Sequence, residues 1–255
     1  MKKLTFLLLT TFLASCTVTN YYQVYKANSE NGTFTKDKIV FEDKSCTVTY
    51  NLWAEGGDIS FSIHNKTDSD LTVDLTKTFF VVNGVAYEYF QNRTFSKSSS
   101  SGTTLTSYPY YYYWYEHPSK VSGTNSSSFS TSFAEKPELT IPSKTLINVS
   151  EYHISNSRYV NCDLSKYPSR SKVKTLKFDK SNPPFVFYNL ITYNAKGDAT
   201  GMENKFYVSE VTNLPESEMF TKSYTDVCGR KYEIPKKVFK DVAPDKFYIH
   251  YTTEK

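Results

Sequence analysis

The chain has 255 residues, with 30 Lys and Arg against 26 Asp and Glu, so its formal charge at neutral pH is only +4. This balance gives no electrostatic argument for nucleic-acid binding. Aromatic residues make up 16% of the sequence, which is too many for a chain that is disordered throughout. After residue 15 no apolar run approaches the roughly 18 residues that a membrane-spanning helix needs.

The first sixteen residues have the layout of an export signal. Two lysines precede a short apolar segment, residues 4–13, which is too short to span a membrane but fits a secretory signal peptide over residues 1–15. The ending Leu13-Ala14-Ser15-Cys16 resembles the lipobox of bacterial lipoproteins. The resemblance implies cleavage before Cys16, with diacylglycerol on its thiol and an acyl chain such as palmitate on its amine. An ordinary signal peptide followed by a chance cysteine is the alternative.

This resemblance predicts a membrane-anchored lipoprotein of the bacterial cell envelope that faces the periplasm or the outside. Several acyl chains make such anchoring effectively permanent, at about 0.8 kcal/mol per buried CH₂ group. Residues 16–38 then form an N-terminal tether and a first strand region.

Apolar and polar residues alternate along most of the remaining chain, which predicts β-strands. The expected strands, in chain order, cover residues 46–52, 59–63, 71–75, 79–82, 85–89, 139–141, 146–149, 152–154, 174–178, 185–193, 206–211 and 247–251. Asn83-Gly84 predicts a two-residue hairpin turn, because both positions tolerate positive φ. The strand at 185–193 is almost wholly apolar, which is typical of a strand covered on both faces. One short helix is expected at residues 215–224, with Pro215 at its start.

About a dozen short strands with at most one short helix predict a mostly β fold, an antiparallel β-sandwich. The segments 63–84 and 139–144 resemble immunoglobulin-like domains of uncharacterised bacterial lipoproteins. The resemblance covers residues 39–150 and implies a sandwich without catalytic residues. We expect a single domain of residues 39–255 with an insertion at 96–132. Two β subdomains, 39–150 and 151–255, are the alternative.

The insertion is rich in serine at both ends and in tyrosine at its centre, residues 108–115. The serine-rich flanks have the composition of flexible loops. Tyrosine combines a broad apolar ring with a polar tip and loses little entropy on binding, so such segments contact sugar rings or protein partners. Pro109 disfavours a central strand and favours an edge strand or a projecting hairpin.

Alternation in an extended segment places Tyr108, Tyr110, Tyr112 and Trp114 on one side and the three remaining tyrosines on the other. We predict that the first set lies against the sandwich and that the second set is open to a partner. The candidate ligand- or partner-binding residues are Tyr111, Tyr113, Trp114 and Tyr115. Packing of all these rings on the sandwich is the alternative.

Besides Cys16, the mature chain contains three cysteines, Cys46, Cys162 and Cys228. Cys46 lies on the apolar face of a predicted strand, where a thiol acts as a small buried hydrophobe. Because an exported protein meets an oxidising compartment, we expect a disulfide between Cys162 and Cys228.

The sequence contains no Gly-x-Ser-x-Gly motif, no phosphate-binding loop and no paired histidines at metal-ligand spacing. We therefore expect no catalytic residues, no metal and no cofactor. The favoured interpretation is a lipid-anchored, non-catalytic binding or structural module with an envelope protein or a glycan as partner. The alternatives are a glycan-binding lipoprotein that uses residues 108–115, and an envelope hydrolase without a readable motif.

Replacing Cys16 with Ala is expected to move the protein from the membrane to the soluble fraction, because the residue that carries the lipid is lost. Detergent partitioning, with mass spectrometry of the N-terminal peptide, measures this. Unchanged partitioning, together with an N-terminal peptide that carries no fatty acid in the parent protein, would refute the lipobox interpretation.

Overall fold

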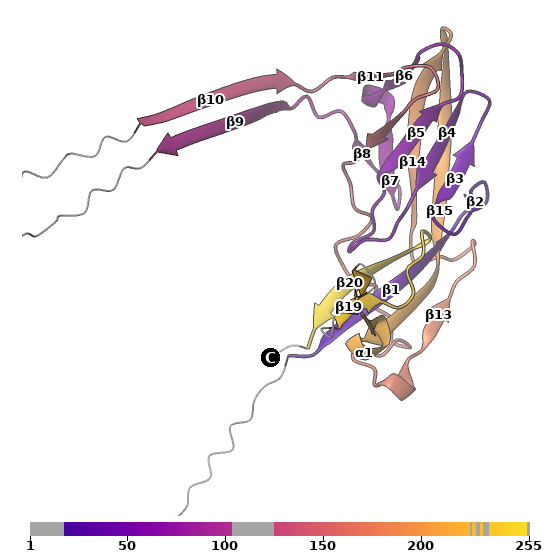
Figure 1. Cartoon of the computed structure of the whole chain (residues 1–255). Helices are drawn as coiled ribbons and strands as arrows, with labels where there is room; N and C mark the ends of the chain where they lie inside the picture. The colour runs from indigo at the N-terminus through magenta and orange to yellow at the C-terminus, as the bar shows by residue number, and fades with distance from the viewer. Residues whose placement is uncertain (1–17, 104–124, 225, 228–229, 232–234, 254–255) are drawn as a thin grey trace, which may run out of the picture.

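The computed structural model describes residues 18–103, 125–224, 226–227, 230–231 and 235–253 (Figure 1). These residues form an antiparallel β-sandwich, and the predicted mostly β fold with no more than one short helix is confirmed for them.

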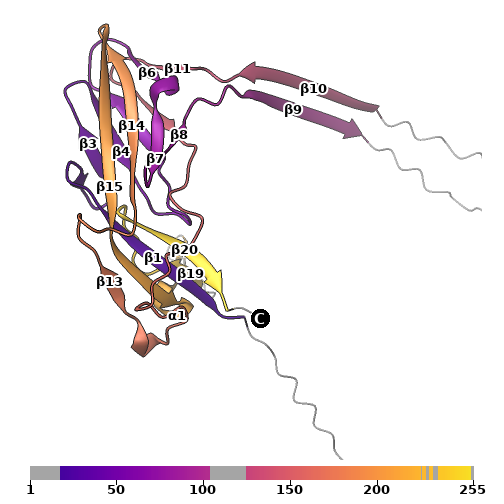
Figure 2. The same cartoon turned by 180° about the vertical axis from the view of Figure 1, so that it is seen from behind.

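The larger sheet extends along the whole sandwich (Figures 1 and 2). Its main strands, in spatial order, are β11 (Glu138–Ile141), β6 (Leu71–Asp74), β14 (Val186–Ala195), β15 (Asp198–Pro215), β1 (Asn20–Asn28) and β20 (Lys246–Thr252). Strands β7 (Phe79–Val82), β8 (Val85–Glu88) and β13 (Thr175–Lys177) attach beside this row. Strands from both sides of residue 150 share the sheet, which favours one domain over two subdomains.

The smaller sheet covers the upper part of the larger one in Figure 1. Its strands, in spatial order, are β12 (Leu146–Val149), β5 (Phe61–Asn65), β4 (Cys46–Tyr50), β3 (Ile39–Glu42) and β2 (Thr33–Phe34). Aromatic rings fill the space between the sheets. The Phe206 ring lies 5.3 Å from Phe41, 5.3 Å from Tyr50 and 5.2 Å from Phe187, measured between centroids.

Three further strand pairs stand outside the two sheets in the described part of the chain. They are β9 (Thr94–Thr103) with β10 (Asn125–Ala134), β16 (Phe220–Ser223) with β19 (Lys236–Phe239), and β17 (Asp226–Val227) with β18 (Arg230–Lys231). The helical turns are η1 (Leu75–Lys77), η2 (Arg170–Lys172) and α1 (Glu216–Met219).

Strand β15 is the longest described strand, with 18 residues. One extra residue interrupts its pairing with β1. Its partner β1 pairs Lys26 with Glu210 but Ala27 with Val208, so Ser209 forms a bulge. Before the bulge the buried side chains are at even positions, and after it they are at odd positions, beginning with Val211. The bulge therefore keeps both halves of the strand facing the core.

Buried side-chain amides fix the register of the central strands. Asn189 of β14 lies directly opposite Asn204 of β15, and both side chains are fully buried. The Nδ2 groups of both residues donate to the Tyr50 hydroxyl, at 3.3 and 2.8 Å. Gln23 and Asn213 form a second opposed pair between β1 and β15, joined by a 2.8 Å hydrogen bond. A one-residue slip of either pair would separate these groups and leave buried amides unpaired.

The segment Glu55–Asp58 connects β4 to β5 and also joins two distant parts of the chain. The Gly56 N–H donates to the Tyr248 carbonyl at 2.8 Å, and the Ile154 N–H donates to the Gly57 carbonyl at 2.9 Å. Both glycines have positive φ, +77° and +74°. The backbone freedom of glycine thus lets one short segment bind β20 and the 152–155 connection together.

Several local predictions are confirmed. Asn83 and Gly84 have φ of 48° and 83° and form the turn between β7 and β8. A second turn with positive φ at both positions, Lys196 at 58° and Gly197 at 94°, joins β14 to β15. Cys46 is fully buried on the core side of β4, as its alternation pattern indicates.

Four predictions are wrong or incomplete. The helix expected at residues 215–224 is a single turn, because residues 220–223 pair with β19 instead. Residues 152–154 make an isolated bridge between His153 and Asp58 and do not form a strand. Strand β14 buries alternate side chains and leaves the others half-exposed, so it is not covered on both faces. The serine-rich flanks of the insertion, expected as flexible loops, are the paired strands β9 and β10.

Replacing Gly57 with Ala is expected to destabilise the protein strongly, because the new Cβ would lie 2.7 Å from Ile154 Cδ1 and 2.9 Å from Phe247 Cγ. The control Gly84→Ala has a similar φ of +83° but no atom within 4 Å, so it carries the backbone strain alone. We expect about 1 kcal/mol for Gly84→Ala and an additional 1–3 kcal/mol, roughly, for Gly57→Ala. Urea unfolding of both variants measures the difference, and equal losses would contradict the close packing around Gly57.

Candidate functional site

The β9–β10 ribbon leaves the sandwich and extends far beyond it (Figures 1 and 2). Ten residue pairs hold it together, from Thr94 opposite Ala134 at the base to Thr103 opposite Asn125 at the far end. At the usual rise of a β-strand, ten residues span about 33 Å. Residues 104–124 connect Thr103 to Asn125 in the sequence and lie outside the described residues.

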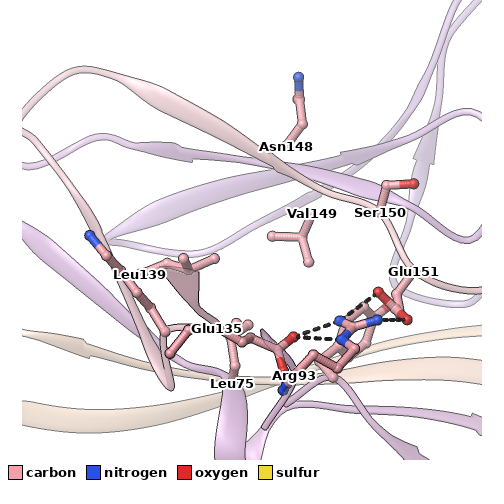
Figure 3. Close-up of a pocket in the computed structure, with 11 residues that line it drawn as sticks. Leu75, Arg93, Glu135, Leu139, Asn148, Val149, Ser150 and Glu151 are labelled. Carbon is pink, nitrogen blue, oxygen red and sulfur yellow. Dashed lines mark hydrogen bonds and ion pairs between the residues drawn. The ribbon is translucent and has the colours of Figure 1, made fainter. Parts of the chain in front are cut away.

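A pocket of about 370 Å³ lies at the base of this ribbon, between β11 and β12, which are edge strands of the two sheets. Its apolar lining comes from Leu75, Tyr89, Leu139 and Val149. Its polar lining comes from Arg93, Glu135, Lys136, Asn148, Ser150 and Glu151. Figure 3 shows the Arg93 guanidinium between the carboxylates of Glu135 and Glu151.

Arg93 is held by both carboxylates. Its Nη2 donates to Glu135 Oε1 at 2.5 Å, and its Nη1 donates to Glu151 Oε1 at 2.5 Å. A further bond of 3.0 Å joins Nη2 to Glu151 Oε2. The Glu135 side chain is only 8% exposed, so this ion pair is shielded from water much better than a typical surface pair. We call these three residues the Arg93 clamp.

Backbone groups complete the clamp. The N–H groups of Gln91 and Arg93 both donate to Glu135 Oε2 at 3.0 Å, and the Glu135 N–H donates to the Arg93 carbonyl at 2.8 Å. The Gln91 side chain donates to the Tyr152 hydroxyl at 2.9 Å, and that hydroxyl donates to the Glu88 carbonyl. The two chains that enter the ribbon are therefore tied to each other and to the 151–152 segment of the sandwich.

The electrostatics of the clamp limit its chemistry. Hydrogen bonds and charge from Arg93, with two backbone N–H donors, lower the pKa of Glu135 to about 2. The two carboxylates in turn raise the pKa of Arg93 above its ordinary value. Glu135 is therefore ionised at neutral pH and has no proton to donate as a general acid. The arrangement fixes the ribbon base and offers charged and polar groups to a ligand at the pocket rim.

The clamp residues are absent from the sites that the sequence predicts. Arg93 and Glu135 immediately flank the insertion at 96–132, on opposite sides of it. Opposite charges at the two ends of an insertion are the signal that could have identified this pair. Glu151 carries no such signal, because it belongs to the connection that follows β12 and reaches Arg93 only in the folded chain.

The residues predicted to carry function mostly fall outside the part of the chain that the structure describes. These are Cys16, Tyr111, Tyr113, Trp114, Tyr115 and Cys228. Cys162 is exposed, and its expected pairing with Cys228 stays a prediction because Cys228 lies outside the described residues. Burial raises the pKa of Cys46 to about 12, so this thiol is protonated and unreactive at neutral pH.

Within the described ranges, no three His, Cys, Asp or Glu side chains gather as a metal site. His153 is exposed, and His64 and His250 are half-exposed on the outer faces of β5 and β20. No helix among residues 18–103, 125–224 and 235–253 is long and apolar enough to cross a membrane.

Comparison with known proteins identifies no relative: no family model matches the chain, and neither curated proteins nor solved structures are significantly similar to it.

Replacing Arg93 with Ala is expected to loosen the ribbon base, because Glu135 then loses its cation in a poorly hydrated position. We expect a loss of about 1–2 kcal/mol, between the values typical of exposed and buried ion pairs. Faster amide exchange should be confined to residues 88–94 and 134–136. The control Lys180→Ala removes an exposed pair with Glu30, so it should cost less than about 0.5 kcal/mol.

The clamp should also respond to acid. The pKa of Glu135 is about 2 in the folded protein and ordinarily 4.5, so its contribution to stability is complete above pH 4.5. It is lost progressively as the pH falls from 4.5 toward 2.

For the Arg93→Ala variant, amide exchange at the ribbon base that equals that of the parent protein would contradict the role of the clamp.

Proposed function

We propose that the chain is a lipid-anchored protein of the bacterial cell envelope that acts as a non-catalytic binding module. In this proposal Cys16 carries the anchor, and the tyrosine-rich segment 108–115 contacts a partner protein of the envelope. The observation that supports it is the β9–β10 ribbon, which leaves the sandwich as a separate arm and is fixed at its base by the Arg93 clamp.

The ribbon and the start of the chain lie at opposite ends of the sandwich, which suits a protein that holds a binding segment away from the membrane. Strand β1 begins at the end of the sandwich marked C in Figure 1, and the ribbon leaves near β6 and β11 at the other end. The 18 residues of β15 connect these ends and span at most about 60 Å. A chain anchored at Cys16 would hold the ribbon well above the bilayer.

The chemistry of the segment between the two ribbon strands fits recognition. Tyrosine and tryptophan provide large rigid contact surfaces with a hydrogen-bonding tip, and they are frequent in binding loops. The expected division places Tyr111, Tyr113 and Tyr115 on one side of an extended segment. Trp114 remains among the candidate contacts, because alternation does not determine which side faces outward.

A glycan is the second candidate partner. Aromatic rings stack on sugar rings, and the pocket at the ribbon base presents Asn148, Ser150 and charged groups that can bind hydroxyls. Loss of glycan-array binding in Trp114→Ala would favour this form of the proposal over a protein partner.

The arrangement of Glu135 and Glu151 argues against the hydrolase alternative. Two carboxylates that converge in a pocket are what a glycoside hydrolase uses, but one of them must hold a proton. Arg93 lies between the two groups and keeps the pKa of Glu135 near 2. The pair is thus better suited to holding the ribbon than to proton transfer.

Replacing residues 104–124 with Asn-Gly is expected to abolish partner binding without unfolding the sandwich. Thr103 and Asn125 are already paired, so a two-residue turn can join them. Crosslinking and co-purification from intact envelopes measure binding, and thermal unfolding measures the integrity of the sandwich. The control Tyr224→Ser removes an exposed tyrosine elsewhere and should bind normally. Capture of the same partners by the shortened variant would contradict the proposal.

A further inference from the structure

The end of the sandwich where β1 begins has an unusual surface. Tyr21 of β1, Tyr251 of β20 and Tyr167 form a group of rings. Their centroids lie 5.1 Å apart for Tyr21 and Tyr167, 5.7 Å for Tyr21 and Tyr251, and 6.1 Å for Tyr167 and Tyr251. All three residues are half-exposed.

Two cationic side chains lie on these rings. The Arg158 guanidinium carbon is 4.3 Å from the centroid of the Tyr251 ring, and Lys166 Nζ is 5.1 Å from that of Tyr167. The Tyr251 hydroxyl donates to the Lys166 carbonyl at 2.6 Å, which fixes the loop against β20. We call Tyr21, Tyr167, Tyr251, Arg158 and Lys166 the tyrosine–cation cluster.

The chain between this cluster and Cys16 is very short. Thr19 is already fixed to the sandwich, because the Thr253 N–H donates to its carbonyl at 3.0 Å and its own N–H donates to Thr253 Oγ1 at 3.2 Å. Three residue steps from Cys16 to Thr19 reach at most about 11 Å. Tyr21 is two residues farther along the strand, about 7 Å.

We propose that this end of the sandwich is a membrane-contact surface, with the phospholipid headgroups of the bilayer as its occupant. The inference rests on the proposed lipidation of Cys16 and extends it, because it assigns the orientation of the folded domain. A tether of at most about 11 Å between Cys16 and Thr19 keeps the start of β1 within reach of the headgroups.

The chemistry of the cluster fits this occupant. Tyrosine rings are enriched at the level of lipid headgroups, where one end of the side chain meets apolar material and the other meets water. Arginine and lysine beside them attract anionic headgroups. Two exposed apolar side chains are close to the cluster in the sequence: Val18, 48% exposed, precedes β1, and Val160, 81% exposed, follows Arg158 by two residues.

Two acidic side chains near this end, those of Glu216 and Glu218, are paired within the fold. Glu216 pairs with Lys237 at 2.5 Å and accepts a 3.2 Å hydrogen bond from Asn20. Glu218 pairs with Arg170 at 2.6 Å. These two carboxylates are therefore paired within the fold, and the Arg158 guanidinium lies on the Tyr251 ring of the same surface.

Tryptophan fluorescence in vesicles tests the inference on the full-length lipidated protein. The two native tryptophans, Trp53 and Trp114, are first replaced with Phe. Single reporters are then introduced as Val18→Trp, Val160→Trp and Leu146→Trp. Leu146 is 56% exposed and serves as the control far from the membrane, because it pairs with His64 near the opposite end of the sandwich.

The vesicles contain phosphatidylethanolamine, phosphatidylglycerol and a lipid with a nitroxide on its headgroup, which quenches nearby tryptophan. The Val18→Trp reporter should lose most of its fluorescence through anchoring alone. The Val160→Trp reporter should also lose a large part of it, and the Leu146→Trp reporter should lose none.

The outcomes separate the inference from the proposal on which it rests. Quenching at position 18 without quenching at position 160 would overturn the membrane-contact surface and leave the anchor intact. An unquenched Val18→Trp reporter would overturn the anchor itself.

Charge reversal supplies a second test. Arg158→Glu with Lys166→Glu should reduce quenching at position 160 in anionic vesicles and leave quenching at position 18 unchanged. The matched control, Lys196→Glu with Lys205→Glu, changes two exposed lysines, one in the β14–β15 turn and one in the middle of β15 opposite Tyr188, and should have no effect. Equal quenching in both double variants would show that the two cations make no contact with the headgroups.

Discussion

The register of the long strand β15 is the constraint on which the rest of the structure depends. This strand pairs with β14 over its first half and with β1 over its second half. The pairs Asn189–Asn204 and Gln23–Asn213 bury amides at both halves. Each buried amide left unpaired costs about 1–3 kcal/mol, so a shifted register is strongly disfavoured. The bulge at Ser209 then lets both halves present apolar side chains to one core.

This constraint places the two parts of the molecule that bear on function at opposite ends. Fixing β1 beside the end of β15 positions Thr19 and the tyrosine–cation cluster at one end. Fixing β14 beside β6 positions β11 and the Arg93 clamp toward the other. The same strand pairing therefore separates the proposed membrane contact from the proposed binding arm, and the clamp limits the motion of that arm at its base.

Alternation along the sequence predicts most strands and the Asn83-Gly84 turn, because these depend on neighbouring residues. It fails where pairing with distant residues decides the structure. Residues 220–223 look helical but pair with β19, and the serine-rich flanks look flexible but pair with each other. The Arg93 clamp was missed for the same reason, because its ion pairs join residues 42 and 58 positions apart.

We propose that residues 108–115, which lie between the two ribbon strands in the sequence, contact a partner in the envelope. The most direct measurement places a photoactivatable benzophenone amino acid at position 113 in living cells, with the same residue at position 196 as a control on the sandwich. We expect a discrete, light-dependent crosslinked species from position 113 and none from position 196. No crosslink from position 113, or the same species from both positions, would contradict it.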